Sequence, residues 1–197
     1  MLYSFLRQLG RIFLIPLGLK GKGTHNIPST GPIIVAANHV SVWDPIIVAL
    51  IINRPINFMA KAELFNYKVL GKLLEKTYVF PVKRGAADRT AIKKAILVLE
   101  EGKVLGIFPE GSRNKSGEEI KAQAGVAMIA LKAGAPVLPV ACVGTERILP
   151  IGWFSPFEVR IGKPLTLEEF KGEKANSKLM AEVSDLITQE INTLLQE

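Results

Sequence analysis

Asn38 to Asp44 is the stretch whose residue types and spacing could carry out proton transfer. His39, one of only two histidines in the chain, lies five residues before Asp44 and directly after an apolar run. A histidine accepts a proton from a hydroxyl near neutral pH when one ring nitrogen is free and a carboxylate holds the other. Because helical neighbours lie three or four residues apart, a spacing of five requires a turn. The alternative is that Asp44, just before Pro45, only caps a following helix and that His39 is an ordinary loop residue.

Two further polar clusters follow apolar runs later in the chain. The first consists of Lys83 and Arg84. The second is a tight polar turn made of Glu110, Gly111, Ser112 and Arg113. A guanidinium binds phosphate oxygens in pairs, and a glycine lets the backbone approach a ligand closely. Together with the histidine and acid, these clusters indicate a hydroxyl nucleophile on a phosphate-bearing substrate. The alternatives are an exposed basic turn at Lys83 and an ordinary turn with a surface ion pair at 110–113.

The elements that would position these clusters alternate between strand and helix. Strands are expected at residues 33–37, 56–60, 77–82, 104–108, 136–143 and 157–161. Helices are expected at residues 45–52, 62–76, 88–101, 122–133 and 179–195. The last of these carries an apolar stripe, which fits either the core or a dimer face. This alternation predicts a single α/β domain with a largely parallel sheet flanked by helices. If the strands run parallel, all three clusters arrive at the same edge of the sheet.

The composition limits the classes of function. A chain of 197 residues, 48% of them hydrophobic, fits one globular domain. The formal charge of +7 and a pI near 9.5 favour an anionic partner. Nucleic acid is not expected, because no aromatic residues are interleaved with the basic clusters. Cys142, the only cysteine, lies in an apolar run and is expected to be buried, and His25 is expected at the surface. One cysteine and two histidines leave few ligands for a catalytic metal.

Residues 1–20 have the pattern of an amphipathic helix with a basic polar face. Leucine, isoleucine and phenylalanine recur at helical spacing, and Arg7 and Arg11 fall on the other side. Polar residues interrupt the apolar runs, so the stretch is shorter than the ~20 apolar residues that span a bilayer. We therefore expect residues 1–30 to be a membrane-binding helix and loop, and residues 31–197 to form the α/β domain. The alternative is a terminal helix that packs on the core.

The three clusters and their flanking residues resemble the motifs of the glycerolipid acyltransferase family. Residues 38–44 match its first motif, N-H-x-S-x-x-D, and residues 108–113 match its F-P-E-G-[TS]-R motif. The V-F-P-V-K-R stretch at 79–84 and the V-L-P-V stretch at 137–140 are similar to two further blocks. Two near-complete motifs in the right order, 70 residues apart, are highly specific together.

This resemblance implies acyl transfer from a thioester of acyl carrier protein or coenzyme A to the sn-2 hydroxyl of lysophosphatidic acid. The product would be phosphatidic acid, an intermediate of phospholipid biosynthesis. By resemblance, His39 is the general base and Asp44 orients it, with no metal and no cofactor beyond the acyl donor. The resemblance assigns the glycerol phosphate to Glu110, Gly111, Ser112 and Arg113, with Lys83 and Arg84 nearby.

One departure from the family pattern follows the second motif. Many members have a lysine where this chain has Gln123, and Lys121 is close enough in sequence to replace it. Since acceptor and product are lipids, we expect a peripheral or monotopic protein on the cytoplasmic face of the cell membrane, attached through residues 1–20. The alternatives are an acyltransferase for another lysolipid, and a non-catalytic basic module that binds membranes.

Overall fold

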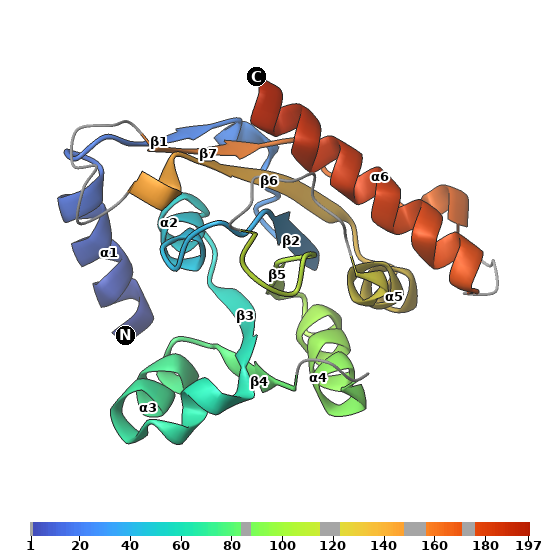
Figure 1. Ribbon diagram of the computed structural model, residues 1–197, viewed down its shortest axis with the longest axis horizontal. Helices are drawn as coiled ribbons and strands as arrows, with labels where there is room; N and C mark the ends of the chain where they lie inside the picture. The colour runs from blue at the N-terminus through green and yellow to red at the C-terminus, as the bar shows by residue number, and fades with distance from the viewer. Residues whose placement is uncertain (1, 84–87, 115–122, 148–156, 171–175) are drawn as a thin grey trace.

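The strands form one sheet in the computed structural model, which describes residues 2–83, 88–114, 123–147, 157–170 and 176–197 (Figure 1). In order across the sheet, the strands are β1 (Leu19–Lys22), β7 (Phe157–Ile161), β6 (Val137–Val143), β2 (Ile33–Ala37), β5 (Val104–Ile107), β3 (Ile56–Lys61) and β4 (Phe80–Val82). Strands from β6 to β4 run parallel to their neighbours, and β7 is antiparallel to β6. The expected α/β domain with a largely parallel sheet is confirmed.

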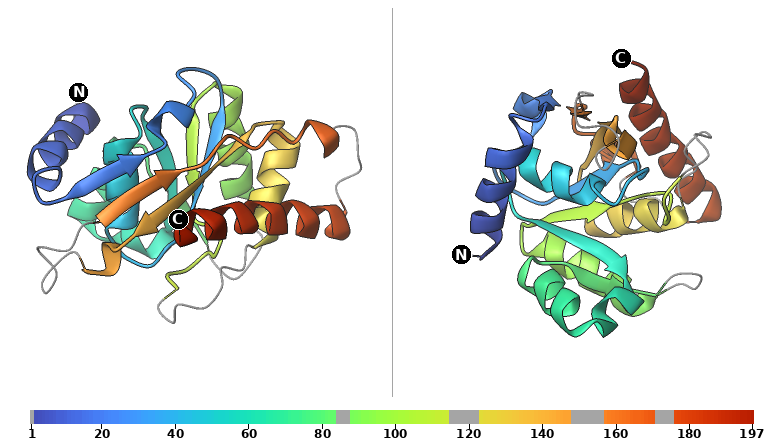
Figure 2. Two further views of the ribbon diagram at one scale, coloured as in Figure 1. Left: turned by 90° about the horizontal axis from the view of Figure 1, so that it is seen from above. Right: turned by 60° about the vertical axis from the view of Figure 1, so that its left-hand side comes forward.

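Helices cover both faces of the sheet (Figures 1 and 2). They are α1 (Leu2–Leu14), α2 (Asp44–Ile51), α3 (Lys68–Lys76), α4 (Arg89–Glu100), α5 (Ala124–Ala133) and α6 (Ser177–Gln196). Short 3-10 turns lie at η1 (Thr24–Asn26), η2 (Ala62–Asn66), η3 (Thr145–Arg147) and η4 (Glu168–Phe170). α2 packs on one face of the sheet, and α4, α5 and α6 pack on the other. α1 lies outside α2, so it contacts the sheet layer mainly through that helix.

The central strand β2 is buried along its whole length, as its unbroken apolar run predicts. Ile33 and Val35 belong to the core on the α2 side, whereas Ile34 and Ala36 belong to the core beneath α4, α5 and α6. A shift of one residue would exchange these two sets, so burial on both faces fixes the register of β2. The position of His39, two residues after the strand, is fixed with it.

Two segments differ from what the sequence predicts. Leu19–Lys22 forms β1, although the sequence predicts helix up to residue 20 and loop from residue 21. Only Leu19 is buried in this strand, so pairing with β7 and not an apolar pattern makes it a strand. The helix predicted at 62–76 is broken at Tyr67, which is extended and separates η2 from α3. The break lets the buried Gly71 pack against the backbone of Phe65, where a side chain would clash.

The C-terminal stripe belongs to the core and not to an exposed dimer face. Val183, Ile187 and Ile191 are fully buried on α6, which packs on β6 and α5. Cys142 is buried and His25 is exposed, as the sequence predicts.

Candidate active site

The candidate site lies at the carboxyl edge of the sheet, where the chain leaves β2. β2 pairs in parallel with β5 on one side and with β6 on the other. The loops that follow these three strands therefore meet at one edge, as expected for an open α/β sheet. Contacts from residues after β5 and after β6 to the His39 loop confirm this meeting.

His39 and Asp44 are in direct contact through a turn. His39 Nδ1 lies 2.9 Å from Asp44 Oδ2. The same oxygen accepts the backbone N–H groups of Val40 and Ser41, each at 2.7 Å. Since the carboxylate is an acceptor, Nδ1 carries the proton and Nε2 is the nitrogen that can take one from a substrate. The imidazole is 13% exposed and the Asp44 side chain is 0% exposed, so the ring is accessible to a substrate whereas the carboxylate is buried.

The hydrogen bonds of Asp44 contradict the alternative in which this residue serves only as a helix cap. α2 begins at Asp44, with Trp43 in the cap position and Pro45 in the first turn. The Asp44 carboxylate accepts N–H groups that precede it in the chain, so it closes the turn before α2. Ser41 is also part of this turn, because its buried hydroxyl accepts the N–H of Trp43 at 3.3 Å.

Thr145 holds the second oxygen of Asp44 and is absent from the sequence prediction. Its hydroxyl donates to Asp44 Oδ1 at 2.5 Å, and the residue is 0% exposed. Thr145 lies at the start of η3, two residues after the end of β6 and 101 residues from Asp44. The sequence carried one signal that could have indicated Thr145: it is a polar residue that follows an apolar strand, and that strand ends at the same edge of the sheet as β2. With Thr145, both carboxylate oxygens have donors, so Asp44 is held in one orientation.

Asn38 fastens the end of β2 to β6. Its side-chain Nδ2 donates to Cys142 O at 3.0 Å, and its Oδ1 accepts the N–H of Cys142 at 2.6 Å. The amide thereby continues the ladder of the sheet beyond the last strand residue, which accounts for an asparagine in a fully buried position. Burial raises the pKa of the Cys142 thiol well above its usual value, so this thiol stays neutral.

Glu110 meets the His39 loop from the other side. Glu110 Oε1 accepts the backbone N–H of His39 at 2.9 Å, and the carbonyl of His39 accepts the N–H of Asn114 at 2.7 Å. Burial raises the pKa of Glu110 above its ordinary value of 4.5; the bond from His39 opposes the rise and the charge of Asp44 adds to it. The sequence predicts that Glu110 binds glycerol phosphate. The contact seen here holds the backbone of His39, and binding of the glycerol phosphate by Glu110 stays a prediction.

Aromatic rings cover one side of the imidazole. The ring of Phe108 stacks on that of His39 with centroids 4.2 Å apart, and Phe58 stacks on Phe108 at 5.8 Å. The sequence analysis gave Phe108 only as the first residue of the F-P-E-G-[TS]-R motif, without a function, and did not identify Phe58. Because β3 and β5 are neighbours, the two rings stand side by side and form an apolar wall that keeps water from this face of His39.

The turn at 109–111 is held by Gln123. Gly111 has a φ of 68°, a left-handed conformation that glycine adopts without strain, and a Cβ there would collide with the Gln123 amide. The N–H of Gln123 donates to Pro109 O at 2.9 Å, and its Nε2 donates to Glu110 O at 3.3 Å. At the position where the family pattern has lysine, this chain therefore has a residue that fixes the turn. Lys121 lies outside the described residues.

Ser112 and Arg113 are exposed at the end of this turn. No described contact ties either residue to His39 itself, so their binding function remains a prediction.

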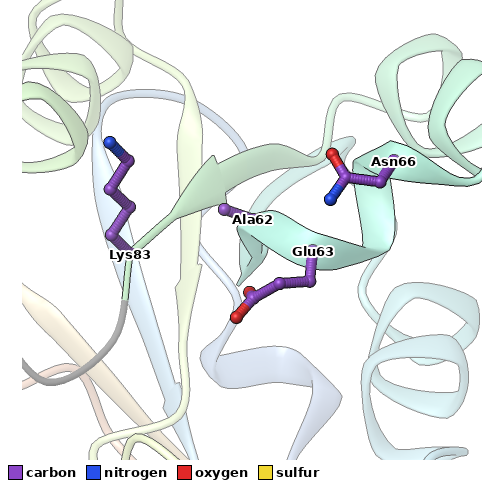
Figure 3. A pocket seen from close by; sticks show the side chains of 4 residues that line it. All are labelled: Ala62, Glu63, Asn66 and Lys83. Atoms are coloured by element: carbon purple, nitrogen blue, oxygen red, sulfur yellow. The ribbon is translucent and has the colours of Figure 1, made fainter.

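Lys83 lies further from His39 than the other clusters. It follows β4, and its side chain lines an open hollow of about 310 Å³ with Ala62, Glu63 and Asn66 of η2 (Figure 3). β5 and β3 lie between β2 and β4. Three strand spacings of about 4.8 Å place the two strand ends roughly 14 Å apart. The sheet brings Lys83 to the predicted edge but not into contact range of the imidazole, and Arg84 lies outside the described residues.

Comparison with known proteins identifies the family. Residues 19–143 match the family model described as Acyltransferase. The chain belongs to the acyltransferase family. It is 30% identical over 195 residues to a 1-acyl-sn-glycerol-3-phosphate acyltransferase of Bacillus subtilis, covering 98% of this chain and 96% of that relative. A lyso-ornithine lipid O-acyltransferase of Pseudomonas aeruginosa is 38% identical over 113 residues, which are 56% of this chain and 42% of the relative.

The fold is similar to that of a solved acyltransferase. The crystal structure of the 1-acyl-sn-glycerophosphate acyltransferase PlsC from Thermotoga maritima superposes with a TM-score of 0.75 at 27% identity. The alignment covers 98% of this chain and 79% of that chain. The mainly parallel sheet and the helices on its two faces are therefore those of this acyltransferase family.

The arrangement in this acyltransferase suits proton transfer from a hydroxyl. In the ranges that the structure describes, no group of three or more histidine, cysteine, aspartate or glutamate side chains could hold a metal ion. A histidine with a buried carboxylate on Nδ1 and an apolar wall on one face has the geometry of a general base. Acyl transfer to a hydroxyl requires such a base.

Proposed function

We propose that this acyltransferase moves a fatty acyl group to the sn-2 hydroxyl of 1-acyl-sn-glycerol 3-phosphate and so forms phosphatidic acid. The acyl donor is a thioester of acyl carrier protein or coenzyme A. The contact between His39 and the fully buried Asp44 carries the proposal, since it supplies a base for a hydroxyl nucleophile. The Bacillus subtilis relative, which aligns over almost its full length, is named for this reaction.

The reaction needs no acyl-enzyme. His39 Nε2 takes the proton of the sn-2 hydroxyl while the hydroxyl oxygen forms a bond to the thioester carbonyl carbon. The tetrahedral intermediate collapses by breaking the carbon–sulfur bond, and the thiolate takes the proton back from the imidazolium. Asp44 stabilises the imidazolium in between, and Thr145 keeps the carboxylate in place.

The substrate phosphate is bound by exposed cations near this edge of the sheet. Arg113 follows the turn whose Glu110 contacts the His39 backbone, and a guanidinium suits bidentate phosphate binding. Lys83 is further away, so its long side chain has to extend across the hollow beside η2.

Membrane attachment through residues 1–20 is supported by the position of α1. No residue of α1 is buried, and Phe5, Ile12 and Phe13 are more than 60% exposed. The helix packs on α2 through Gly10, which lies against Leu50, and Leu14 packs against the core. Phe5, Ile12 and Phe13 point away from it. No helix in the described parts of the chain is long and apolar enough to cross a bilayer. An interfacial position on the cytoplasmic face of the cell membrane fits these features.

Replacing His39 with Ala tests the function directly. The purified variant should lose about 10²- to 10⁴-fold in kcat with lysophosphatidate and either acyl donor, because it lacks the general base. His25→Ala changes the other histidine, which is exposed, and should match the unmodified enzyme. Activity of His39→Ala within a few fold of normal, with the fold intact by circular dichroism, would rule out this mechanism.

A second candidate is an acceptor other than lysophosphatidate. The Pseudomonas aeruginosa relative, similar over just over half of this chain, is named for transfer to lyso-ornithine lipid. The basic side chains at the site favour a phosphate monoester over a zwitterionic amino lipid. Turnover of a panel of lysolipids at equal concentration decides between the two, and a higher kcat/KM for lyso-ornithine lipid would displace the first candidate.

A further inference from the structure

Helix α3 exposes apolar side chains that a water-facing helix would not carry. Val69 is 84% exposed, and Leu70 and Leu73 are also exposed on the same helix. Tyr67, directly before the helix, and Tyr78, two residues after its end, are also exposed. Val69 and Leu73, and likewise Leu70 and Leu73, lie on the same helical face because they are four and three positions apart, so the helix carries one apolar patch. Single exposed apolar residues are ordinary, but a contiguous patch marks a surface that contacts something.

The patch is not a core face that lacks its partner. α3 already uses its other side for packing, since the buried Gly71 lies against the backbone of Phe65. This close approach fixes the rotation of the helix about its own axis. Val69 and Leu73 therefore point outward because the opposite side of α3 is packed.

Basic residues line one border of the patch. Lys68, Lys72 and Lys76 follow each other at a spacing of four, so they form a row beside Val69 and Leu73. Like charges in such a row repel each other in water, whereas an anionic surface would attract all of them. An apolar face bordered by lysines is the composition of a helix that lies in a membrane interface.

One end of the patch lies beside the start of α1. The rings of Tyr3 on α1 and Tyr78 after α3 are 5.5 Å apart, and the Tyr3 hydroxyl accepts the N–H of Ile56 at 3.3 Å. These contacts hold the start of α1 beside the end of α3, and Figures 1 and 2 show the two helices on the same side of the molecule.

We propose that α3 is a second membrane-contacting element, which lays Val69, Leu70 and Leu73 into the interface of an anionic bilayer beside α1. The inference rests on the proposed function only in that α1 is taken to bind the same membrane. One residue, Tyr67, separates α3 from η2, whose Ala62, Glu63 and Asn66 line the hollow with Lys83 (Figure 3). With α3 in the headgroup layer, this hollow lies at the membrane surface. A lipid phosphate then reaches Lys83 while its acyl chain stays in the bilayer.

Vesicle binding of the full-length protein, without acceptor or acyl donor, tests the proposal. The α3 variant Val69→Ser with Leu73→Ser should lower the partition coefficient about tenfold on vesicles of phosphatidylglycerol and phosphatidylcholine. Its matched control is Leu97→Ser, which removes an exposed leucine from α4.

The lysine row is tested separately. Replacing Lys68, Lys72 and Lys76 together with Gln should weaken binding about as strongly, but only on anionic vesicles and only at low salt. Lys93→Gln with Lys94→Gln on α4 is the control for charge.

Equal binding of the α3 variant and the Leu97→Ser control would overturn the proposal. Phe5→Ser with Ile12→Ser on α1 provides the reference: loss of binding with this variant alone would leave α1 as the membrane contact and exclude α3. Sedimentation velocity separates a lipid from a second copy of the chain. A dimer that dissociates in the α3 variant, with vesicle binding unchanged, would assign the patch to self-association. Because no substrate is present, none of these results depends on the acyl transfer reaction.

Discussion

The loops after β2 and after β4 leave parallel strands at the same edge of the sheet, but they present their functional side chains differently. In the β2 loop, Asp44 is 0% exposed and accepts hydrogen bonds from His39, Val40, Ser41 and Thr145. In the β4 loop, Lys83 has an exposed side chain beside an open hollow, and its backbone N–H donates to Asp88.

The difference follows from the place of each strand in the sheet. β2 has a parallel neighbour on both sides, so residues from two other loops can reach its end and hold it. β4 is at the edge and has a neighbour on one side only. A general base must stand within hydrogen-bond reach of its substrate, whereas a cation attracts a phosphate over a longer distance. The central position therefore suits the base and the edge position suits a charge on a long side chain.

Asp44→Asn is the strongest test of the central loop. The amide can place its oxygen where Oδ2 accepts from Val40 and Ser41, and its NH₂ group toward the Thr145 hydroxyl. The fold should therefore survive while the negative charge beside the imidazole is lost. We expect kcat to fall about 10²- to 10⁴-fold with little change in KM. A variant with more than a tenth of normal kcat would show that the charge of Asp44 is not needed.

Thr145→Val should have a smaller effect of the same kind. Valine has the shape of threonine but cannot donate to Asp44 Oδ1. We expect about a tenfold loss of kcat, unchanged KM values for both substrates, and recovery in Thr145→Ser, which restores the hydroxyl. Equal loss of kcat in the Val and Ser variants would instead point to packing, and the proposed positioning of Asp44 would be wrong.

Arg113→Ala and Lys83→Ala test the exposed cations. Each should raise KM for lysophosphatidate several-fold, about 1 kcal/mol, and leave KM for the acyl donor nearly unchanged. Lys103→Ala removes another exposed lysine, which pairs with Glu101, and should change neither KM. Parallel increases in both KM values would argue against phosphate binding by these residues.

Of these substitutions, Glu110→Gln should have the smallest effect, and this effect should be mainly on the free energy of unfolding. Gln keeps an oxygen that can accept the N–H of His39 but removes a partly buried charge. The pKa of Glu110 is raised by burial, so this carboxyl favours the folded state below its ordinary pKa of 4.5, and that contribution is lost as the pH rises through the raised value.

The free energy of unfolding of Glu110→Gln should therefore equal or slightly exceed that of the unmodified protein at pH 8. The difference should shrink as the pH falls toward 4.5, because the wild-type carboxyl then becomes neutral as well. Urea unfolding at several pH values measures it. A variant that is clearly less stable at pH 8 would mean that the carboxylate charge itself stabilises the His39 loop.

The sequence alone determined the local features of the site. The unbroken apolar run at 33–37 predicted a strand buried on both faces, and the five-residue spacing of His39 and Asp44 predicted their turn. Both follow from short-range patterns, namely burial periodicity and backbone reach. The alternation of strands and helices likewise predicted the parallel sheet and the common edge of the polar clusters.

The tertiary structure decided which residues meet at that edge. Glu110 is 71 residues and Thr145 is 106 residues from His39, and they reach its loop because β5 and β6 are the strands beside β2. Strand order is set by long-range packing and leaves no local pattern in the sequence. For the same reason the sequence predicted the end of a helix and the start of a loop where β1 lies, since its pairing with β7 makes it a strand. The sequence also did not decide whether the apolar face of α1 is exposed or packed on the core. Periodicity defines an apolar face but not what lies against it.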